Sequence, residues 1–187
     1  DSLRFTLGGR YDHHDVFGGH FSPRGYIVWD TTDNWTIKGG VSQGYKAPRV
    51  EQLNNGINSV SCQGQVFNSG CVGIGNPDLK PEESTNYEVG VYYNADNGFS
   101  SNATVFYNEY KNKIESVTVL RPDLLPLSAG SFTQSENVSK AETKGLEFGT
   151  QIPLYFDSLN LRANYTYMET EKKDGTNKGA PFANTPK

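Results

Sequence analysis

The sequence lacks several features that would point to common classes of protein. No stretch of its 187 residues approaches 18 consecutive apolar residues, so the chain has no membrane-spanning helix. The net charge of −4 leaves no basic stripe for a nucleic acid. The sequence also has no nucleophile elbow, no phosphate loop and no cysteine–histidine spacing typical of zinc. These absences argue against an enzyme, a resident metal and a nucleic-acid partner.

What the sequence has is a repeated alternation of apolar and polar residues. Twenty glycines and eleven tyrosines, with a single methionine, favour β structure. An alternation with period two is the signature of a strand with two different faces. Seven segments show it, at residues 3–11, 21–30, 35–45, 86–94, 99–108, 146–154 and 159–167.

The two faces of these segments differ in a way that indicates a transmembrane β-barrel. Aromatic residues bracket the apolar faces, as Phe99 and Tyr107 do over about 26 Å of strand at about 3.3 Å per residue. The other faces carry charges that suit a hydrated or plugged lumen. The further aromatic pairs are Trp35 with Tyr45 and Tyr87 with Tyr93, and the charges are Arg4, Arg10, Lys38, Glu88, Glu147 and Arg162.

The links between the segments are short and long in turn. Short links lie at 31–34, 95–98 and 157–158, and long ones at 13–20, 46–83, 117–136 and from 172 to the end. An up-and-down meander in an outer membrane has short periplasmic turns and long external loops. We therefore expect an all-β, antiparallel barrel segment. Because the chain starts inside a strand and seven strands is an odd number, we also expect a piece of a larger barrel.

Two other architectures fit part of this pattern. A soluble β-sandwich that serves as a binding module also alternates apolar and polar faces. A small self-contained outer-membrane barrel with an adhesive or structural role is the second alternative.

Motifs at specific positions add a family resemblance. Residues 44–49 read GYKAPR, and residues 76–82 read NPDLKPE just before the strand at 86–93. Together with residues 105–115 and 137–147, they resemble the barrel of TonB-dependent outer-membrane receptors. The similarity is greatest to the ferric catecholate group of the enterobactin and colicin I receptors.

The resemblance implies a larger protein. Such receptors have a barrel of about 22 strands and an N-terminal plug, and import iron–siderophore complexes with energy from TonB. Residues 1–187 would then be part of one barrel domain, with 46–83 as a long extracellular loop. The chain departs from the family in lacking a plug, a TonB-contacting segment and enough strands to close. The expected partners are a ferric siderophore, the lipid bilayer, the TonB complex through parts outside this chain, and a colicin or phage.

A site for a ferric catecholate needs cations and aromatic rings rather than iron ligands, because the siderophore already fills the coordination shell of the metal. Cationic and aromatic side chains combine charge attraction with cation–π contacts. We expect no cofactor other than the transported ferric siderophore. The candidates on the long-loop side are Tyr45, Lys46, Arg49, Phe67 and Arg121.

Cysteines and histidines cluster in two polar loops. Cys62 and Cys71 lie in one polar stretch, which fits a disulfide in an oxidising compartment, with two free thiols as the alternative. His13, His14 and His20 are interpreted as solvated loop residues rather than metal ligands.

The junction NPDLKPE predicts where a strand begins. Pro77 and Pro81 prevent the loop from continuing as a hydrogen-bonded ladder. The charged residues between and after them keep the junction in water. We expect the residues that follow to face lipid at every second position.

Overall fold

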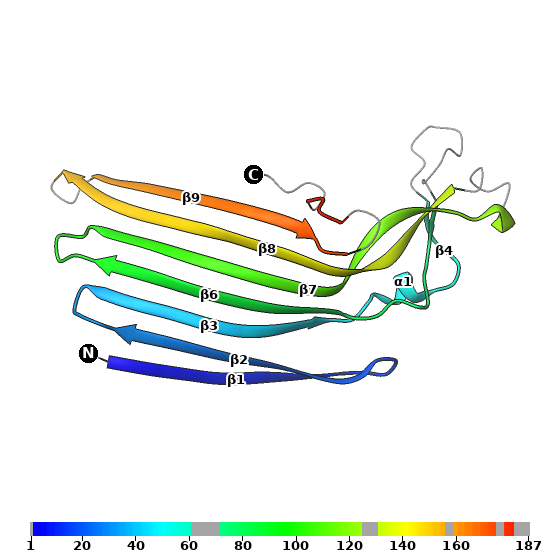
Figure 1. Ribbon diagram of the computed structural model, residues 1–187, viewed down its shortest axis with the longest axis horizontal. Helices are drawn as coiled ribbons and strands as arrows, with labels where there is room; N and C mark the ends of the chain where they lie inside the picture. Colours follow the sequence, from blue (N-terminus) through cyan, green and yellow to red (C-terminus); the bar gives the residue numbers. More distant parts are fainter. Residues whose placement is uncertain (1, 61–71, 125–130, 156–158, 175–177, 182–187) are drawn as a thin grey trace. The chain divides into compact units, whose positions relative to one another are not determined.

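The computed structural model describes residues 2–60, 72–124, 131–155, 159–174 and 178–181 (Figure 1). In these ranges the chain is almost entirely β structure. No helix there is long and apolar enough to cross a membrane. The elements are β1 (Ser2–His14), β2 (Gly18–Asp30), β3 (Trp35–Lys46), α1 (Val50–Leu53), β4 (Ile57–Val60), β5 (Val72–Ile74), β6 (Glu82–Asn94), β7 (Ser100–Leu120), η1 (Pro122–Leu124), β8 (Ser131–Tyr155) and β9 (Leu159–Lys172).

The strands form one sheet in the order β1-β2-β3-β6-β7-β8-β5-β4, with β9 paired to β8. All seven predicted strands are confirmed, as β1, β2, β3, β6, β7, β8 and β9. The chain divides into two compact units. We call residues 1–45, 84–110 and 140–187 the strand unit, and residues 46–83 and 111–139 the loop unit.

The strand unit is a meander of antiparallel hairpins. Strands β1 and β2 pair without interruption from Ser2 opposite Asp30 to His14 opposite Gly18. The predicted long link at 13–20 is therefore wrong, and with it the strict alternation of short and long links. Gly18, with φ of +75°, permits a tight turn that leaves only residues 15–17 outside the strands.

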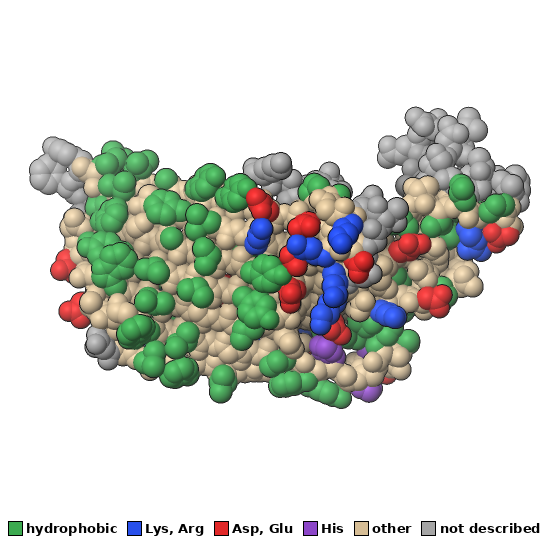
Figure 2. Space-filling view, in the orientation of Figure 1, with side chains coloured by type: hydrophobic (Ala, Val, Ile, Leu, Met, Phe, Trp, Pro, Cys, Tyr) green, Lys and Arg blue, Asp and Glu red, His purple; other side chains and the backbone are tan. Residues whose placement is uncertain are grey.

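One face of the strand unit, here called the outer face, is apolar and uncovered. Leu7 is 86% exposed and Phe5 is 69% exposed, although both lie in a well-paired strand. A soluble sandwich would cover such a face with a second sheet, but all strands of the described residues belong to a single sheet. Figure 2 shows hydrophobic side chains spread over this face and charged ones gathered towards one end. The exposed set includes Leu3, Phe21, Trp29, Val41, Val89, Val91, Val105, Phe148, Leu161 and Tyr165.

Aromatic rings of neighbouring strands meet at both ends of the outer face. At one end the ring centroids of Trp35 and Tyr93 are 4.7 Å apart, and those of Tyr93 and Phe99 are 6.0 Å apart. At the other end Tyr87 and Tyr107 lie 6.2 Å apart. Rings at both borders of an apolar band are typical of the two interfaces of a membrane.

The loop unit has a small core of its own, in a region predicted as loop. Phe132 is fully buried and packs with Val72 and Ile74. Strand β5 pairs antiparallel with β4 and parallel with β8, where Gly73 lies opposite Thr133. These strands of three and four residues are too short to show a period, so the sequence pattern did not reveal them.

Candidate ligand-binding surfaces

The NPDLKPE junction is an ordered structure within the loop unit. The side chain of Asn76 accepts a hydrogen bond from the backbone N–H of Asp78 at 3.0 Å, which closes a tight turn. The same side chain donates to the carbonyl of Ser135 at 3.0 Å. Leu79 is only 2% exposed. The junction is thus anchored by one buried side chain and by a hydrogen bond to β8. Strand β6 starts at Glu82, the last residue of the motif, which is four residues before the predicted strand start at residue 86.

Asn137 joins this junction to two other segments. Its amide group accepts from the backbone N–H of Lys80 at 2.8 Å and donates to the carbonyl of Lys80 at 2.9 Å. It also donates to the carbonyl of Asn112 at 2.6 Å, a residue with φ of +53°. The Asn137 side chain therefore satisfies the backbone N–H and carbonyl of Lys80, as a neighbouring strand would. It also binds the carbonyl of Asn112, a residue of β7 with an unfavourable positive φ.

Glu82 is a second junction residue with a structural role. One carboxylate oxygen accepts from Nζ of Lys46 at 2.8 Å, and the other accepts from the backbone N–H of Ile114 at 2.7 Å. The carboxylate satisfies a backbone donor as well as a cation, so it holds the start of β6 to β7 within the loop unit.

Each predicted cationic contact residue has a carboxylate partner. Lys46 pairs with Glu82, Arg49 with Glu51 at 3.2 Å, and Arg121 with Asp123 at 2.8 Å. The hydrogen bonds from the Arg121 guanidinium hold the pKa of Asp123 below its usual range. The three cations thus have three separate partners, and an anionic ligand would have to compete with those carboxylates.

Tyr45 lies at the end of β3 in the strand unit. Its ring stacks on His20, with centroids 4.3 Å apart and planes 18° apart. Its backbone carbonyl accepts from the guanidinium of Arg10 at 3.5 Å. Phe67, Cys62 and Cys71 lie outside the described residues, so the predicted aromatic contact and the predicted disulfide both stay predictions.

The predicted loop histidines are strand residues in the structure. His13 and His14 end β1 and His20 lies in β2, so the prediction that they belong to a loop is wrong. His14 packs against Phe17, with ring centroids 5.0 Å apart. In the part of the chain that the structure describes, no three or more His, Cys, Asp or Glu residues are grouped to hold a metal ion.

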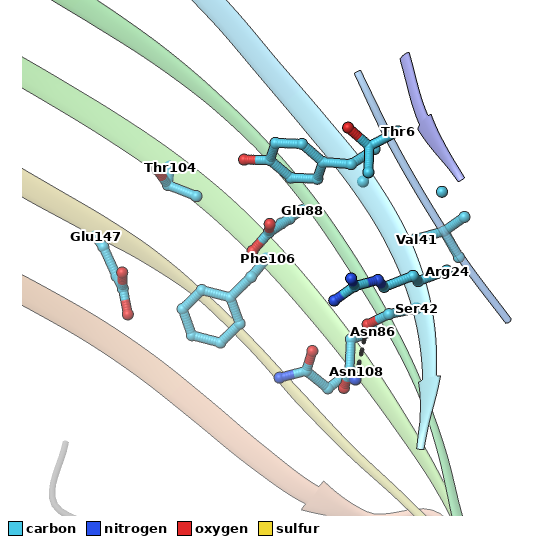
Figure 3. A pocket seen from close by; sticks show the side chains of 13 residues that line it. Thr6, Arg24, Val41, Ser42, Asn86, Glu88, Thr104, Phe106, Asn108 and Glu147 are labelled. Atoms are coloured by element: carbon cyan, nitrogen blue, oxygen red, sulfur yellow. Dashed lines mark hydrogen bonds between the residues drawn. The ribbon is translucent and has the colours of Figure 1, made fainter. Parts of the chain in front are cut away.

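The face opposite the outer face, here called the inner face, has a polar hollow of about 720 Å³. Side chains from β1, β2, β3, β6, β7 and β8 line it, and Figure 3 shows how they lie. Arg24, Glu88 and Glu147 form no ion pair or hydrogen bond with the described residues. Seven of the lining residues had been predicted to lie on the polar faces of their strands, namely Thr6, Ser42, Asn86, Glu88, Thr104, Asn108 and Glu147.

Two aromatic side chains complete the inner hollow. Tyr26 lies over Gly40, and Phe106 lies over Gly145, so closely that a Cβ at either glycine would overlap the ring. The glycines permit aromatic residues on a polar face, so Tyr26 departs from the apolar–polar alternation of residues 21–30. Arg24, Tyr26 and Phe106 were not predicted as lining residues, although glycines at strand positions opposite aromatic residues were a usable signal.

Comparison with known proteins agrees with this architecture. The whole chain, residues 1–187, matches the family described as TonB dependent receptor-like, beta-barrel. It is 37% identical over 190 residues to the iron-regulated outer membrane virulence protein of Vibrio cholerae, covering 100% of this chain and 28% of that protein. It is 39% identical over 181 residues to the ferric enterobactin receptor of Pseudomonas aeruginosa, covering 91% of this chain and 24% of that protein.

Solved structures give the same result. The siderophore receptor PirA of Pseudomonas aeruginosa superimposes with a TM-score of 0.78 at 30% identity, over 91% of this chain and 32% of that one. A mutant of the P. aeruginosa ferric enterobactin receptor in complex with enterobactin gives a TM-score of 0.69 at 35% identity, over 89% of this chain and 24% of that one.

An apolar outer face bordered by aromatic rings, with a polar inner face, defines a strand segment of an outer-membrane β-barrel. The chain belongs to the β-barrel family of TonB-dependent receptors, and ferric enterobactin receptors are among its relatives. It spans about a quarter to a third of the length of these relatives, and the two from Pseudomonas aeruginosa are named as receptors.

Proposed function

We propose that the protein containing these residues imports ferric siderophores of the catecholate class across the outer membrane, with energy from TonB. The observation that supports this most strongly is the match of the whole chain to the receptor family, with ferric enterobactin receptors among its relatives. The barrel would be completed, and its lumen plugged, by parts of the protein outside these residues.

We further propose that the loop unit faces the outside of the cell and meets the ligand first. Its exposed cations suit a bulky anion, and aromatic side chains would add cation–π contacts. The proposed contacts are Tyr45, Lys46, Arg49, Phe67 and Arg121, and the loop that carries Phe67 would be closed by a disulfide between Cys62 and Cys71.

The inner hollow supports a filled lumen. Its unpaired charges of both signs would cost free energy against an apolar filling, whereas a polar plug can satisfy them. The alternative is a lumen filled with water alone. Such an open pore would have no need of the aromatic side chains of Tyr26 and Phe106 on the inner face.

Iron uptake by living cells tests the proposed function. The gene for the whole receptor is deleted, and uptake of radioactive iron is measured with a catecholate and with a hydroxamate carrier. We expect loss of catecholate-borne iron only, restored by the gene and again lost when TonB is inactivated. Unchanged catecholate uptake in the deletion strain would contradict the proposal.

A further inference from the structure

The outer face of the strand unit continues as a charged surface beyond one of its aromatic borders. The hydroxyl of Tyr107 donates to Glu109 at 3.4 Å, and the hydroxyl of Tyr167 donates to Glu169 at 2.6 Å. Each tyrosine thus links the apolar band to a carboxylate two residues further along the same face of its strand. Figure 2 shows charged side chains gathered at this end of the outer face.

The register of β8 and β9 arranges the charged residues in rows that cross the two strands. The outermost row follows from a backbone hydrogen bond, in which the N–H of Lys173 donates to the carbonyl of Lys140 at 3.0 Å. In order away from the apolar band, the rows are Leu146 with Tyr167, Lys144 with Glu169, Glu142 with Glu171, and Lys140 with Lys173.

The carboxylates of these rows have lysine partners. Nζ of Lys173 lies 2.9 Å from Glu142 and 2.7 Å from Glu171, so one cation bridges the two opposed carboxylates. In the row nearest the apolar band, Lys144 pairs with Glu169 at 3.3 Å. The acidic residues of β8 and β9 at this end are therefore neutralised within the strand unit.

Lys140 is the cation for which these rows supply no carboxylate. Its side chain is exposed and forms no ion pair or hydrogen bond in the part of the chain that the structure describes. Its neighbour across the strands is Lys173, and like charges in this position destabilise a sheet. An ammonium has three donors, so Lys173 keeps one donor after its two carboxylate contacts. An anion held by both lysines would remove the repulsion.

The distance of Lys140 from the apolar band indicates what kind of headgroup would carry this anion. Lys140 lies six residues beyond Leu146, which is about 20 Å of strand at about 3.3 Å per residue. For strands tilted by about 35–45°, this corresponds to about 14–16 Å along the membrane normal. The headgroup layer of one phospholipid leaflet is only about 5–8 Å deep. The anion at Lys140 therefore belongs to a headgroup taller than that of a phospholipid.

The other border of the outer face has no such set of cations. The described turns at that border, residues 31–34 and 95–98, contain Asp33 and Asp96 but no lysine or arginine. The lysine rows are found where β7 and β8 continue into the loop unit. In the proposed orientation, this end meets the outer leaflet.

We propose that Lys140 and Lys173 bind a phosphate group on the sugar headgroup of a phosphorylated glycolipid in the outer leaflet. The acyl chains of the same lipid would cover the apolar band beside β8 and β9. The proposal depends on the orientation with the loop unit outside, but not on the identity of the transported ligand.

Native mass spectrometry of the purified full-length receptor, titrated with a lipopolysaccharide that has a phosphorylated inner core, tests this site. We expect Lys140→Gln to raise the Kd about threefold and Lys140→Glu to raise it at least about tenfold. Lys140→Arg keeps the charge and should bind as wild type does. Lys80→Gln is the matched control, because it neutralises an exposed lysine outside these rows, and it should leave the Kd unchanged.

Two further lipids distinguish the source of the phosphate. The same lipopolysaccharide without its core phosphates, and phosphatidylglycerol, should each bind equally well to wild type and to Lys140→Gln. If phosphatidylglycerol binding falls as much in Lys140→Gln as lipopolysaccharide binding does, a short anionic headgroup is sufficient and the glycolipid assignment is wrong.

Equal Kd values of wild type and Lys140→Glu for the phosphorylated lipopolysaccharide would overturn the site. Lys140 has no side-chain partner among the described residues, so we expect its variants to keep the wild-type unfolding temperature. The Kd for ferric enterobactin should also stay unchanged in Lys140→Gln. Failure of the lipid site would therefore leave the proposed uptake intact.

Discussion

Asn137 shows how much of the loop unit depends on single side chains. Its three hydrogen bonds connect residues 57 and 25 positions away in the chain. Nothing local in the sequence marks this role, because it depends on where β6 and β7 bring Lys80 and Asn112. The motif NPDLKPE could be predicted as a strand start, but its side-chain partner on β8 could not.

Asn137→Asp is a nearly isosteric test of this arrangement. The aspartate keeps the acceptor for Lys80 N–H but loses both donors and places oxygen against two carbonyl oxygens. We expect a loss of about 1–3 kcal/mol in the stability of the loop unit, at least as large as for Asn137→Ala. Protease cleavage of the loop on intact cells measures it. Wild-type resistance of Asn137→Asp would show that the amide is not structural.

Substitutions of Glu82 can distinguish the contribution of its ion pair to stability from that of its hydrogen bond to the backbone. Glu82→Gln removes the charge opposite Lys46 but keeps an oxygen for Ile114 N–H, so we expect a cost below about 1 kcal/mol. Glu82→Ala leaves that N–H without a partner and should cost about 1–3 kcal/mol. Thermal unfolding of the two full-length variants distinguishes them, and equal costs would mean that the ion pair dominates.

At the scale of elements, period-two alternation predicted both the strands and their faces. Val105, on the apolar face of 99–108, is 54% exposed, and its neighbour Thr104 lines the inner hollow. The prediction failed where segments were short, as in β4 and β5, or where a turn was tight, as after His14. In such places long-range pairing and a single glycine decide the structure, and neither has a period.

The pair Val105 and Thr104 gives a direct test of the two faces. Val105→Arg places a charge in the apolar band, which costs about 2–4 kcal/mol near the middle of a bilayer. Thr104→Arg faces the polar hollow that Glu88 also lines and should be tolerated. The amount of folded receptor in the outer membrane is the measurement. Equal tolerance of both substitutions would contradict the assignment of the faces.

At the scale of the whole molecule, the described residues supply one sector of a barrel and part of its loops. The family match covers the whole chain. The motifs that carried the resemblance lie at the end of β3, directly before β6, in β7 and in β8, and the last two strands are longer than predicted. Ligand contacts were harder to predict, because the local setting of each cation depends on which carboxylate folds against it. The sequence shows Arg49 and Glu51 two positions apart, but it does not show that their side chains form an ion pair.

The most direct test of the central claim is equilibrium binding to the purified full-length receptor. Ferric enterobactin and a ferric trihydroxamate of similar size are titrated under identical conditions. We expect the catecholate to bind with a Kd at least about 100-fold lower, the equivalent of about 2.7 kcal/mol. Equal affinities, or tighter binding of the hydroxamate, would contradict the assignment of this receptor to ferric catecholates.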